Sequence, residues 1–161
     1  MNKQVITWIT AIGLLTTMSN AVAQAGITAN YKVSADELWN AVDFHQPSEN
    51  IMPPIASSTR DGEGLGALKV NMLKGGGEVH LQLVYYSPEE RAFNYIIQSS
   101  PLPVSNYVGE VRVKSLGEGR SQLTWRGVYD PAGVSQEEAD AALQGFYEAI
   151  AGRIGEMFPK E

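Results

Sequence analysis

Cysteine is absent from this chain of 161 residues. The fold therefore cannot contain a disulfide, a thiolate nucleophile or a cysteine-ligated zinc ion, and packing alone must hold it together. Histidine occurs only at His45 and His80, too few for a histidine-rich metal site, so we expect no metal and no cofactor. A Gly-x-Ser-x-Gly nucleophile motif and a phosphate-binding glycine loop are also missing. These absences exclude the commonest hydrolases and nucleotide-binding enzymes.

Basic residues are scarce as well. Lys and Arg together number 12 against 18 Asp and Glu, which gives a formal net charge of -6 at pH 7. No cluster of basic residues could neutralise phosphates, so nucleic acid is excluded as a partner. The same acidity argues against docking on anionic lipid surfaces and suits a soluble monomer.

The amino terminus has the pattern of a secretory signal peptide. Lys3 precedes an apolar segment over residues 5–18, which is short for a membrane span, and small residues follow up to Ala23 and Ala25. We predict that residues 1–25 form the signal peptide, with cleavage after Ala25 or after Ala23, and that no stable membrane insertion remains afterwards. A retained amino-terminal anchor is the alternative. Export without cysteine suits a bacterial periplasm, and secretion is the second option.

Residues 26–161 are expected to form one domain. A first strand over 28–33 leads into a short helix that begins with a capping box of Ser34 and Glu37, and a second short helix fits over 48–52. Six further strands are separated by Gly- and Pro-containing turns. They are predicted over 55–60, 65–73, 78–86, 92–98, 105–114 and 120–129. Hairpin connections between them imply a mostly antiparallel sheet.

The last predicted element is a long amphipathic helix over about residues 136–158. It begins with a second capping box, in which Ser135 is followed three residues later by Glu138. Apolar residues then recur at spacings of three and four. This stripe comprises Leu143, Phe146, Ile150, Ile154 and Met157. Seven strands with one apolar face and a single long helix predict an α+β fold.

The carboxy-terminal half carries the residues by which the chain resembles a known superfamily. They are Tyr95-Ile96-Ile97, Pro101-Leu102-Pro103-Val104, Asn106-Tyr107, Leu123-Thr124-Trp125 and Tyr129-Asp130-Pro131. Together with the long helix, these runs resemble the START-like helix-grip (SRPBCC) superfamily, in its polyketide cyclase/dehydrase and lipid-transport branch, over about residues 27–158. The resemblance implies a curved seven-stranded antiparallel sheet wrapped on the last helix around a cavity. It also implies that the chain holds an apolar small molecule.

Strand alternation indicates which side chains share the face that the resemblance makes concave. The predicted ligand-binding residues are Leu83, Tyr85, Tyr95, Ile97, Tyr107, Trp125 and Tyr129 from the strands, and Phe146 and Ile150 from the helix. Their hydroxyl and indole groups would orient a ligand, and their apolar surfaces would supply contact area. The alternative is an ordinary core in which these polar tips find other partners.

Three functions stay open at this point. The first is an exported binding or carrier protein for an apolar small molecule such as a lipid, isoprenoid, aromatic or polyketide. The second is a cyclase-, dehydratase- or lyase-like enzyme without a metal or nucleophile, in which Tyr95, Tyr107 or His45 performs acid–base chemistry. For His45, a solvent-exposed pair with Asp43 is the alternative. The third is an envelope stress or interaction protein acting through an exposed apolar surface.

Overall fold

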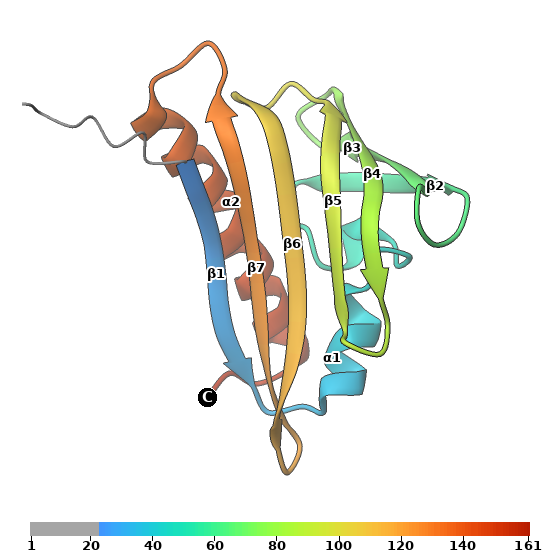
Figure 1. Cartoon of the computed structure of the whole chain (residues 1–161). Helices are drawn as coiled ribbons and strands as arrows, with labels where there is room; N and C mark the ends of the chain where they lie inside the picture. The colour runs from blue at the N-terminus through green and yellow to red at the C-terminus, as the bar shows by residue number, and fades with distance from the viewer. Residues whose placement is uncertain (1–22) are drawn as a thin grey trace, which may run out of the picture.

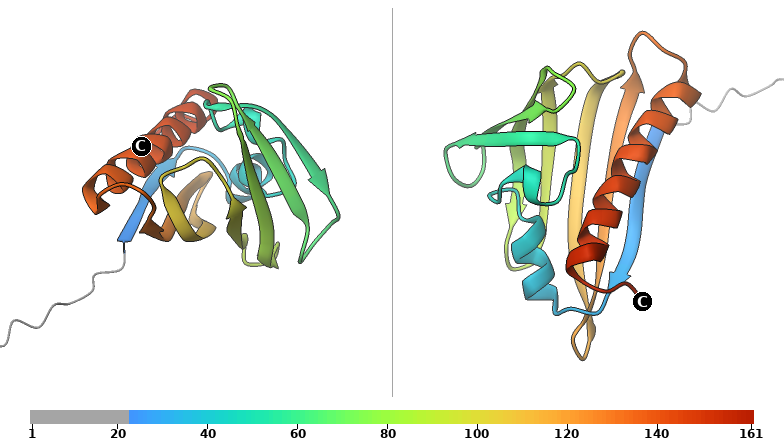
Figure 2. Two further views of the ribbon diagram at one scale, coloured as in Figure 1. Left: turned by 90° about the horizontal axis from the view of Figure 1, so that it is seen from above. Right: turned by 180° about the vertical axis from the view of Figure 1, so that it is seen from behind.

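A curved antiparallel sheet of seven strands wraps around one long helix in the computed structural model, which describes residues 23–161 (Figures 1 and 2). The elements are β1 (Ala23–Tyr31), α1 (Ala35–Val42), the 3-10 helix η1 (Ser48–Asn50), β2 (Ile55–Asp61), β3 (Leu68–Leu73), β4 (Glu78–Ser87), β5 (Ala92–Ser99), β6 (Val104–Gly117), β7 (Arg120–Pro131) and α2 (Gln136–Met157). The strand order is β1-β7-β6-β5-β4-β3-β2. The predicted helix-grip architecture, with two short helices after the first strand, is confirmed.

Both α-helices begin at the predicted capping residues. The Ser34 hydroxyl accepts a hydrogen bond from the backbone N–H of Glu37 at 3.2 Å and begins α1. At the start of α2, the Ser135 hydroxyl accepts from the N–H of Glu138, and the Glu138 carboxylate accepts from the N–H of Ser135 at 2.9 Å. These bonds satisfy amide groups that have no partner inside the helix, which fixes where each helix begins.

Helix α2 lies on the concave side of the sheet, against β1 and β7 (Figure 2). Its buried residues are Ala139, Leu143, Tyr147, Ile150, Ala151 and Ile154. The predicted apolar stripe is therefore only partly correct. Tyr147 is fully buried, whereas Phe146 is half-buried and Met157 is exposed. The helix turns the Tyr147 face onto the sheet, so that Phe146 points to the side, toward the cavity described below.

Strand β1 begins five residues earlier than predicted. It pairs with β7 from Ala23, opposite Tyr129, and continues through Gly26, opposite Arg126. Ala25 is buried, so the chain already belongs to the sheet at this point. The greater part of the predicted signal peptide, residues 1–22, lies outside the described residues.

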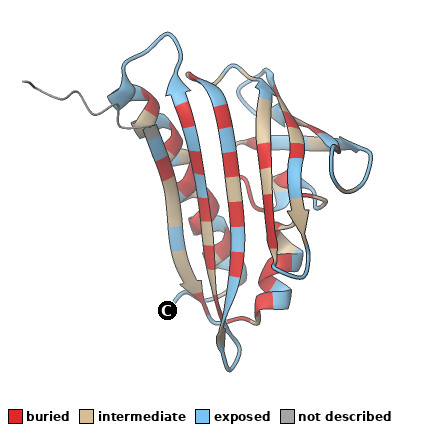
Figure 3. Ribbon diagram, viewed as in Figure 1, coloured by how far each residue is buried: buried red, intermediate tan, exposed pale blue. Residues whose placement is uncertain are grey.

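Alternation of inward and outward residues holds in β6 from Tyr107 to Lys114 and in β7 from Arg120 to Asp130, as Figure 3 shows. In β4 it is interrupted by a bulge. Leu83 lies opposite Tyr95, but Tyr85 lies opposite Asn94, so one extra residue is accommodated between the two pairs. Tyr85 consequently faces outward, 40% exposed, and its hydroxyl donates to Glu90 at 2.7 Å. The prediction that Tyr85 faces the interior is wrong, because it assumed unbroken alternation.

Candidate ligand-binding cavity

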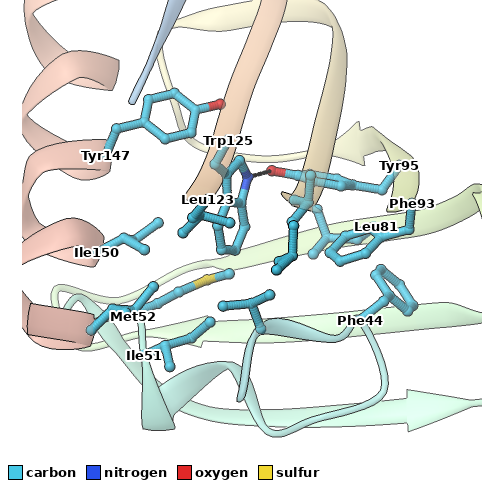
Figure 4. Packing of buried hydrophobic residues seen from close by; sticks show 14 of the residues in the cluster. Phe44, Ile51, Met52, Leu81, Phe93, Tyr95, Leu123, Trp125, Tyr147 and Ile150 are labelled. Carbon is cyan, nitrogen blue, oxygen red and sulfur yellow. Dashed lines mark hydrogen bonds between the residues drawn. The ribbon is translucent and has the colours of Figure 1, made fainter. Parts of the chain in front are cut away.

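A cavity of about 430 Å³ lies between the concave face of the sheet, residues 42–55 and one side of α2. Figure 4 shows side chains around it: Leu81, Phe93, Tyr95 and Trp125 come from the strands, and Phe44, Ile51 and Met52 come from the segment after α1. Most of this wall is apolar. A cavity of this size with few polar groups has the dimensions of a small-molecule site.

Five of the predicted ligand-binding residues line this cavity, namely Tyr95, Ile97, Tyr107, Trp125 and Phe146. Leu83, Tyr129 and Ile150 are buried in the surrounding core and do not reach it. Tyr129 is directed to α2, where its hydroxyl donates to Asp140 at 2.6 Å. The sheet is wide enough that sharing its inner face does not guarantee contact with the cavity.

The tyrosines on the cavity wall belong to a buried hydrogen-bond network. The Trp125 indole N–H donates to the Tyr95 hydroxyl at 3.1 Å, and the hydroxyls of Tyr95 and Tyr107 lie 3.2 Å apart. Tyr107 is also bonded to the hydroxyl of Tyr147 from α2. Four donors thus share three hydrogen bonds, which leaves one O–H free. If Tyr147 donates to Tyr107 and Tyr107 donates to Tyr95, the O–H of Tyr95 has no acceptor and stays free at the cavity wall.

Two glycines in the strands make room for these rings. Gly109 lies opposite Tyr95 and Gly127 lies opposite Gly109, which forms a row without side chains across the sheet. A Cβ atom on Gly109 would lie 2.3 Å from the Tyr95 ring, and one on Gly127 would lie 2.5 Å from the Tyr107 ring. Both rings therefore lie flat on the sheet, which brings their hydroxyls together.

The network keeps its protons over the physiological range. Burial raises the pKa of the Tyr95 hydroxyl. It also raises the pKa values of the Tyr107 and Tyr147 hydroxyls, and these lie well above the ordinary value for tyrosine. These phenols are neutral and serve as hydrogen-bond donors and acceptors. They do not supply a base near neutral pH.

A second polar region lies on β3, and the sequence pattern did not predict it. Lys69 and Asn71 face the cavity and are only 5% and 3% exposed, while Leu68 and Met72, which flank this pair in the sequence, face outward. The polarity of this strand is thus the reverse of an ordinary half-buried strand. The Lys69 ammonium donates to the carbonyl of Gln46 at 2.7 Å and lies 4.7 Å from the centre of the Phe44 ring.

Asn71 and Lys69 differ from the tyrosines because some of their polar atoms have no hydrogen-bond partner in the protein. The Oδ1 atom of Asn71 is buried without a hydrogen-bond partner, the only such side-chain atom among residues 23–161. Burial lowers the pKa of Lys69 from 10.5 to about 8, although the charge of Asp43 partly opposes this shift. A buried polar atom without a partner is unusual in a native structure, and it distinguishes the β3 region from the tyrosine network.

The Asp43–His45 pair exists, but it has a structural role. Nδ1 of His45 lies 2.7 Å from Oδ1 of Asp43, and its Nε2 accepts from the N–H of Gly64 at 3.3 Å. The other carboxylate oxygen of Asp43 accepts from Tyr86 at 2.7 Å. His45 does not line the cavity, and both of its nitrogens are engaged. His45 therefore joins the end of α1 to the loop after β2 and is poorly placed as a catalytic base.

None of the helices within residues 23–161 is long and apolar enough to cross a membrane.

Comparison with known proteins places the fold in a family. The family model described as "Polyketide cyclase / dehydrase and lipid transport" matches residues 23–156. No curated protein matches the chain.

Solved structures share the architecture at low sequence identity. The protein XoxI from Bacillus cereus gives a TM-score of 0.78 at 24% identity, covering 84% of this chain and 95% of that one. The Zhui aromatase/cyclase from Streptomyces sp. R1128 gives 0.67 at 17% identity, covering 83% and 89%. Norcoclaurine synthase from Thalictrum flavum, solved with dopamine and hydroxybenzaldehyde, gives 0.65 at 16% identity, covering 98% and 96%. At these identities the likeness shows the fold.

Proposed function

Because this chain belongs to the polyketide cyclase / dehydrase and lipid transport family, we propose that it is a binding or carrier protein that holds an apolar small molecule in its internal cavity. The observation that supports this most directly is the cavity of about 430 Å³, with apolar walls from the sheet, α2 and the segment after α1. Apolar area supplies affinity, and a few polar groups on the wall orient the ligand.

Binding accounts for the polar groups better than catalysis does. The phenols of Tyr95 and Tyr107 hold their protons, and both oxygens of Asp43 accept hydrogen bonds from neighbouring groups. His45 is outside the cavity wall. Of the groups that the sequence offered for acid–base chemistry, the tyrosines are neutral, Asp43 is hydrogen-bonded to its neighbours, and His45 lies away from the cavity. This arrangement suits a site that binds a ligand without changing it.

The alternative is a cyclase- or dehydratase-like enzyme, and one observation favours it. The free O–H at the Tyr95 end of the network could donate to a ligand carbonyl and stabilise negative charge as it develops there. Incubation with poly-β-keto substrates, followed by mass spectrometry, tests this reading. Turnover that Tyr95→Phe abolishes would establish the enzyme, whereas unchanged substrate bound to the protein would favour the carrier.

The binding proposal is tested with a variant that fills the cavity. Ala149 on α2 is half-buried and lines the cavity, so Ala149→Phe places a ring inside it. We expect the affinity for an uncharged naphthylamine dye, measured by fluorescence titration, to fall by at least about tenfold, since the ring occupies the volume that the dye needs.

Ala141 provides the matched control. It lies on the same helix, is exposed and does not line the cavity, so Ala141→Phe adds the same ring on the solvent side. The control should bind the dye like the unaltered protein. If the unaltered protein binds no dye, or if Ala149→Phe binds it equally well, the cavity is not the binding site.

We further propose that the protein is exported to the periplasm. The supporting pattern is Lys3, the apolar segment over 5–18 and the small residues before Gly26. The pairing of Gln24 and Ala25 with β7 favours cleavage after Ala23, since a cut after Ala25 removes three residues of β1. Amino-terminal sequencing of the protein from an osmotic-shock fraction should give Gln24. An intact Met1 would contradict export.

A further inference from the structure

The polar region on β3 lies in the cavity, and its side chains form a single hydrogen bond among the described residues, from Lys69 to the segment after α1. Lys69 and Asn71 come from alternate positions of β3, so both side chains project from the same face into the cavity. Neither connects β3 to α2 or to the tyrosine network by a hydrogen bond. The side-chain bond formed by Lys69 is the one to the carbonyl of Gln46, and Oδ1 of Asn71 has no partner.

The charge on Lys69 is not neutralised by direct contact. Within residues 23–161 the ammonium forms no ion pair with a carboxylate, and its hydrogen-bond partner is a neutral carbonyl. Asp43 and Glu49 act on it only through space, opposed by Arg60. Asp43 is bound by His45 and Tyr86, and Glu49 accepts from Ser58 at 2.6 Å. The ammonium retains two N–H donors for a ligand.

From these observations, and resting on the proposed binding function, we infer that the cavity takes a ligand with an apolar body and a carboxylate head, and that Lys69 and Asn71 bind the carboxylate. An anionic head would compensate the buried ammonium and accept hydrogen bonds from it. The Asn71 amide adds an N–H donor. Turning this amide to present its donor breaks no hydrogen bond of Oδ1, because Oδ1 has none.

The rest of the cavity suits the apolar body of such a ligand. Phe44, Leu81 and Phe93 lie on the wall around β3, so a chain or ring attached to the carboxylate passes directly into apolar surroundings. The ligand is therefore an amphiphile, such as a fatty acid or an aromatic acid. A neutral lipid or a hydrocarbon would leave the charge of Lys69 uncompensated.

The test compares decanoic acid with decanol, which has the same chain and no charge. Both are titrated against the bound naphthylamine dye at neutral pH. The unaltered protein should bind decanoate at least about tenfold more tightly than decanol, the effect of one charge-assisted hydrogen bond. In Lys69→Met this preference should disappear while the affinity for decanol is retained. Asn71→Leu should reduce the preference several-fold, which provides a second variant if Lys69→Met does not fold.

Lys74→Met is the control for net charge. Lys74 is exposed at the end of the hairpin after β3 and does not line the cavity, so its removal should leave the preference for decanoate intact. Equal affinity of the unaltered protein for decanoate and decanol would overturn the inference and leave the binding function standing. If the unaltered protein binds neither compound nor the dye, the binding function itself fails, and the inference falls with it.

Discussion

The cavity has two polar regions, and they differ in how completely their atoms are paired. In the tyrosine network every hydroxyl oxygen has a partner within the protein, supplied by Trp125, Tyr95, Tyr107 and Tyr147. On β3, Oδ1 of Asn71 has none. The first region ties β5, β6 and β7 to α2 and would persist in an empty protein. The second leaves a buried acceptor unpaired and an ammonium without an ion-pair partner among residues 23–161, which is the basis of the ligand inference above. A polar residue on a cavity wall thus indicates a ligand mainly when its own partners are missing.

The largest effect expected from this contrast is a pH dependence at Lys69. Its pKa falls on folding from 10.5 to about 8, mainly through burial. Between these values the unfolded chain binds more protons than the folded chain, so the contribution of Lys69 to the free energy of unfolding rises as the pH increases from about 8 to about 10.5. The total rise approaches roughly 3 kcal/mol.

Urea unfolding of the protein and of Lys69→Met, at about pH 7 and about pH 10, isolates this contribution. The tyrosines titrate in both proteins and cancel in the difference. The unaltered protein should gain stability relative to Lys69→Met at the higher pH. A difference that does not change with pH would mean that the ammonium is solvated.

Gly127→Ala tests the tyrosine network by placing a methyl group on the sheet against the ring of Tyr107. The new Cβ atom would lie 2.5 Å from the Tyr107 ring, so the ring must shift and disturb its hydrogen bonds with Tyr95 and Tyr147. We expect a loss of about 1–3 kcal/mol in the free energy of unfolding, typical of an overpacked core. Thermal unfolding followed by circular dichroism measures it, and an unchanged midpoint would show that the ring is free to shift.

Tyr95→Phe should destabilise the protein as well, by about 1–2 kcal/mol, because the indole N–H of Trp125 loses its acceptor in a buried place. Tyr85→Phe is the matched control. The Tyr85 hydroxyl donates to Glu90 at the surface, so its loss should change stability by less than about 0.5 kcal/mol. Equal effects of the two variants in urea unfolding would contradict the assignment of Tyr95 to a buried network.

Asn71→Leu should act in the opposite direction. The amide is 3% exposed and its oxygen has no partner, so an apolar side chain of similar size removes a cost and leaves no new unpaired group. A gain of up to about 1 kcal/mol in the ligand-free protein is expected by the same urea assay. A clear loss would mean that Asn71 has a structural partner, and the contrast between the two regions would disappear.

The smallest effect is expected at Gly145. No atom lies within 4 Å of the position of a Cβ on this residue, so close approach of α2 to the sheet does not require glycine there. Gly145→Ala should raise the free energy of unfolding by about 0.5–1 kcal/mol through helix propensity alone. A loss of stability would show that the residue is constrained by a contact that only glycine allows.

The fold follows from the sequence because its signals are local and redundant. Turn residues bound each strand, and the capping residues Ser34 and Ser135 fix where the helices begin. The site is less predictable, since it depends on which face of each strand is turned inward. The bulge in β4 reverses that assignment for Tyr85, and nothing in the run Leu83 to Tyr86 indicates it.

The β3 region was missed for a related reason. Leu68, Val70 and Met72 alternate with Lys69 and Asn71, so the apolar set has the pattern of an inner face although it is turned outward. Which of the two sets is buried depends on how β3 pairs with β2 and β4, and this pairing cannot be read from β3 alone. Tyr147 was missed because Phe146 fits the apolar spacing of α2 equally well. Gly109 and Gly127 did carry a usable signal, since glycine inside a strand often marks close approach of another group.

Strand β1 pairs with β7, so Ala23, the first residue that the structure describes, lies beside Tyr129. This makes completion of the sheet a non-local event. During synthesis the amino-terminal strand emerges long before its partner, and it remains an unpaired ribbon until the hairpin of β6 and β7 and the covering helix α2 exist. Such topologies fold slowly compared with those built from neighbouring contacts. This order of folding is compatible with the export proposed above, because a chain that stays unfolded until its last third is available can pass through a narrow channel in extended form.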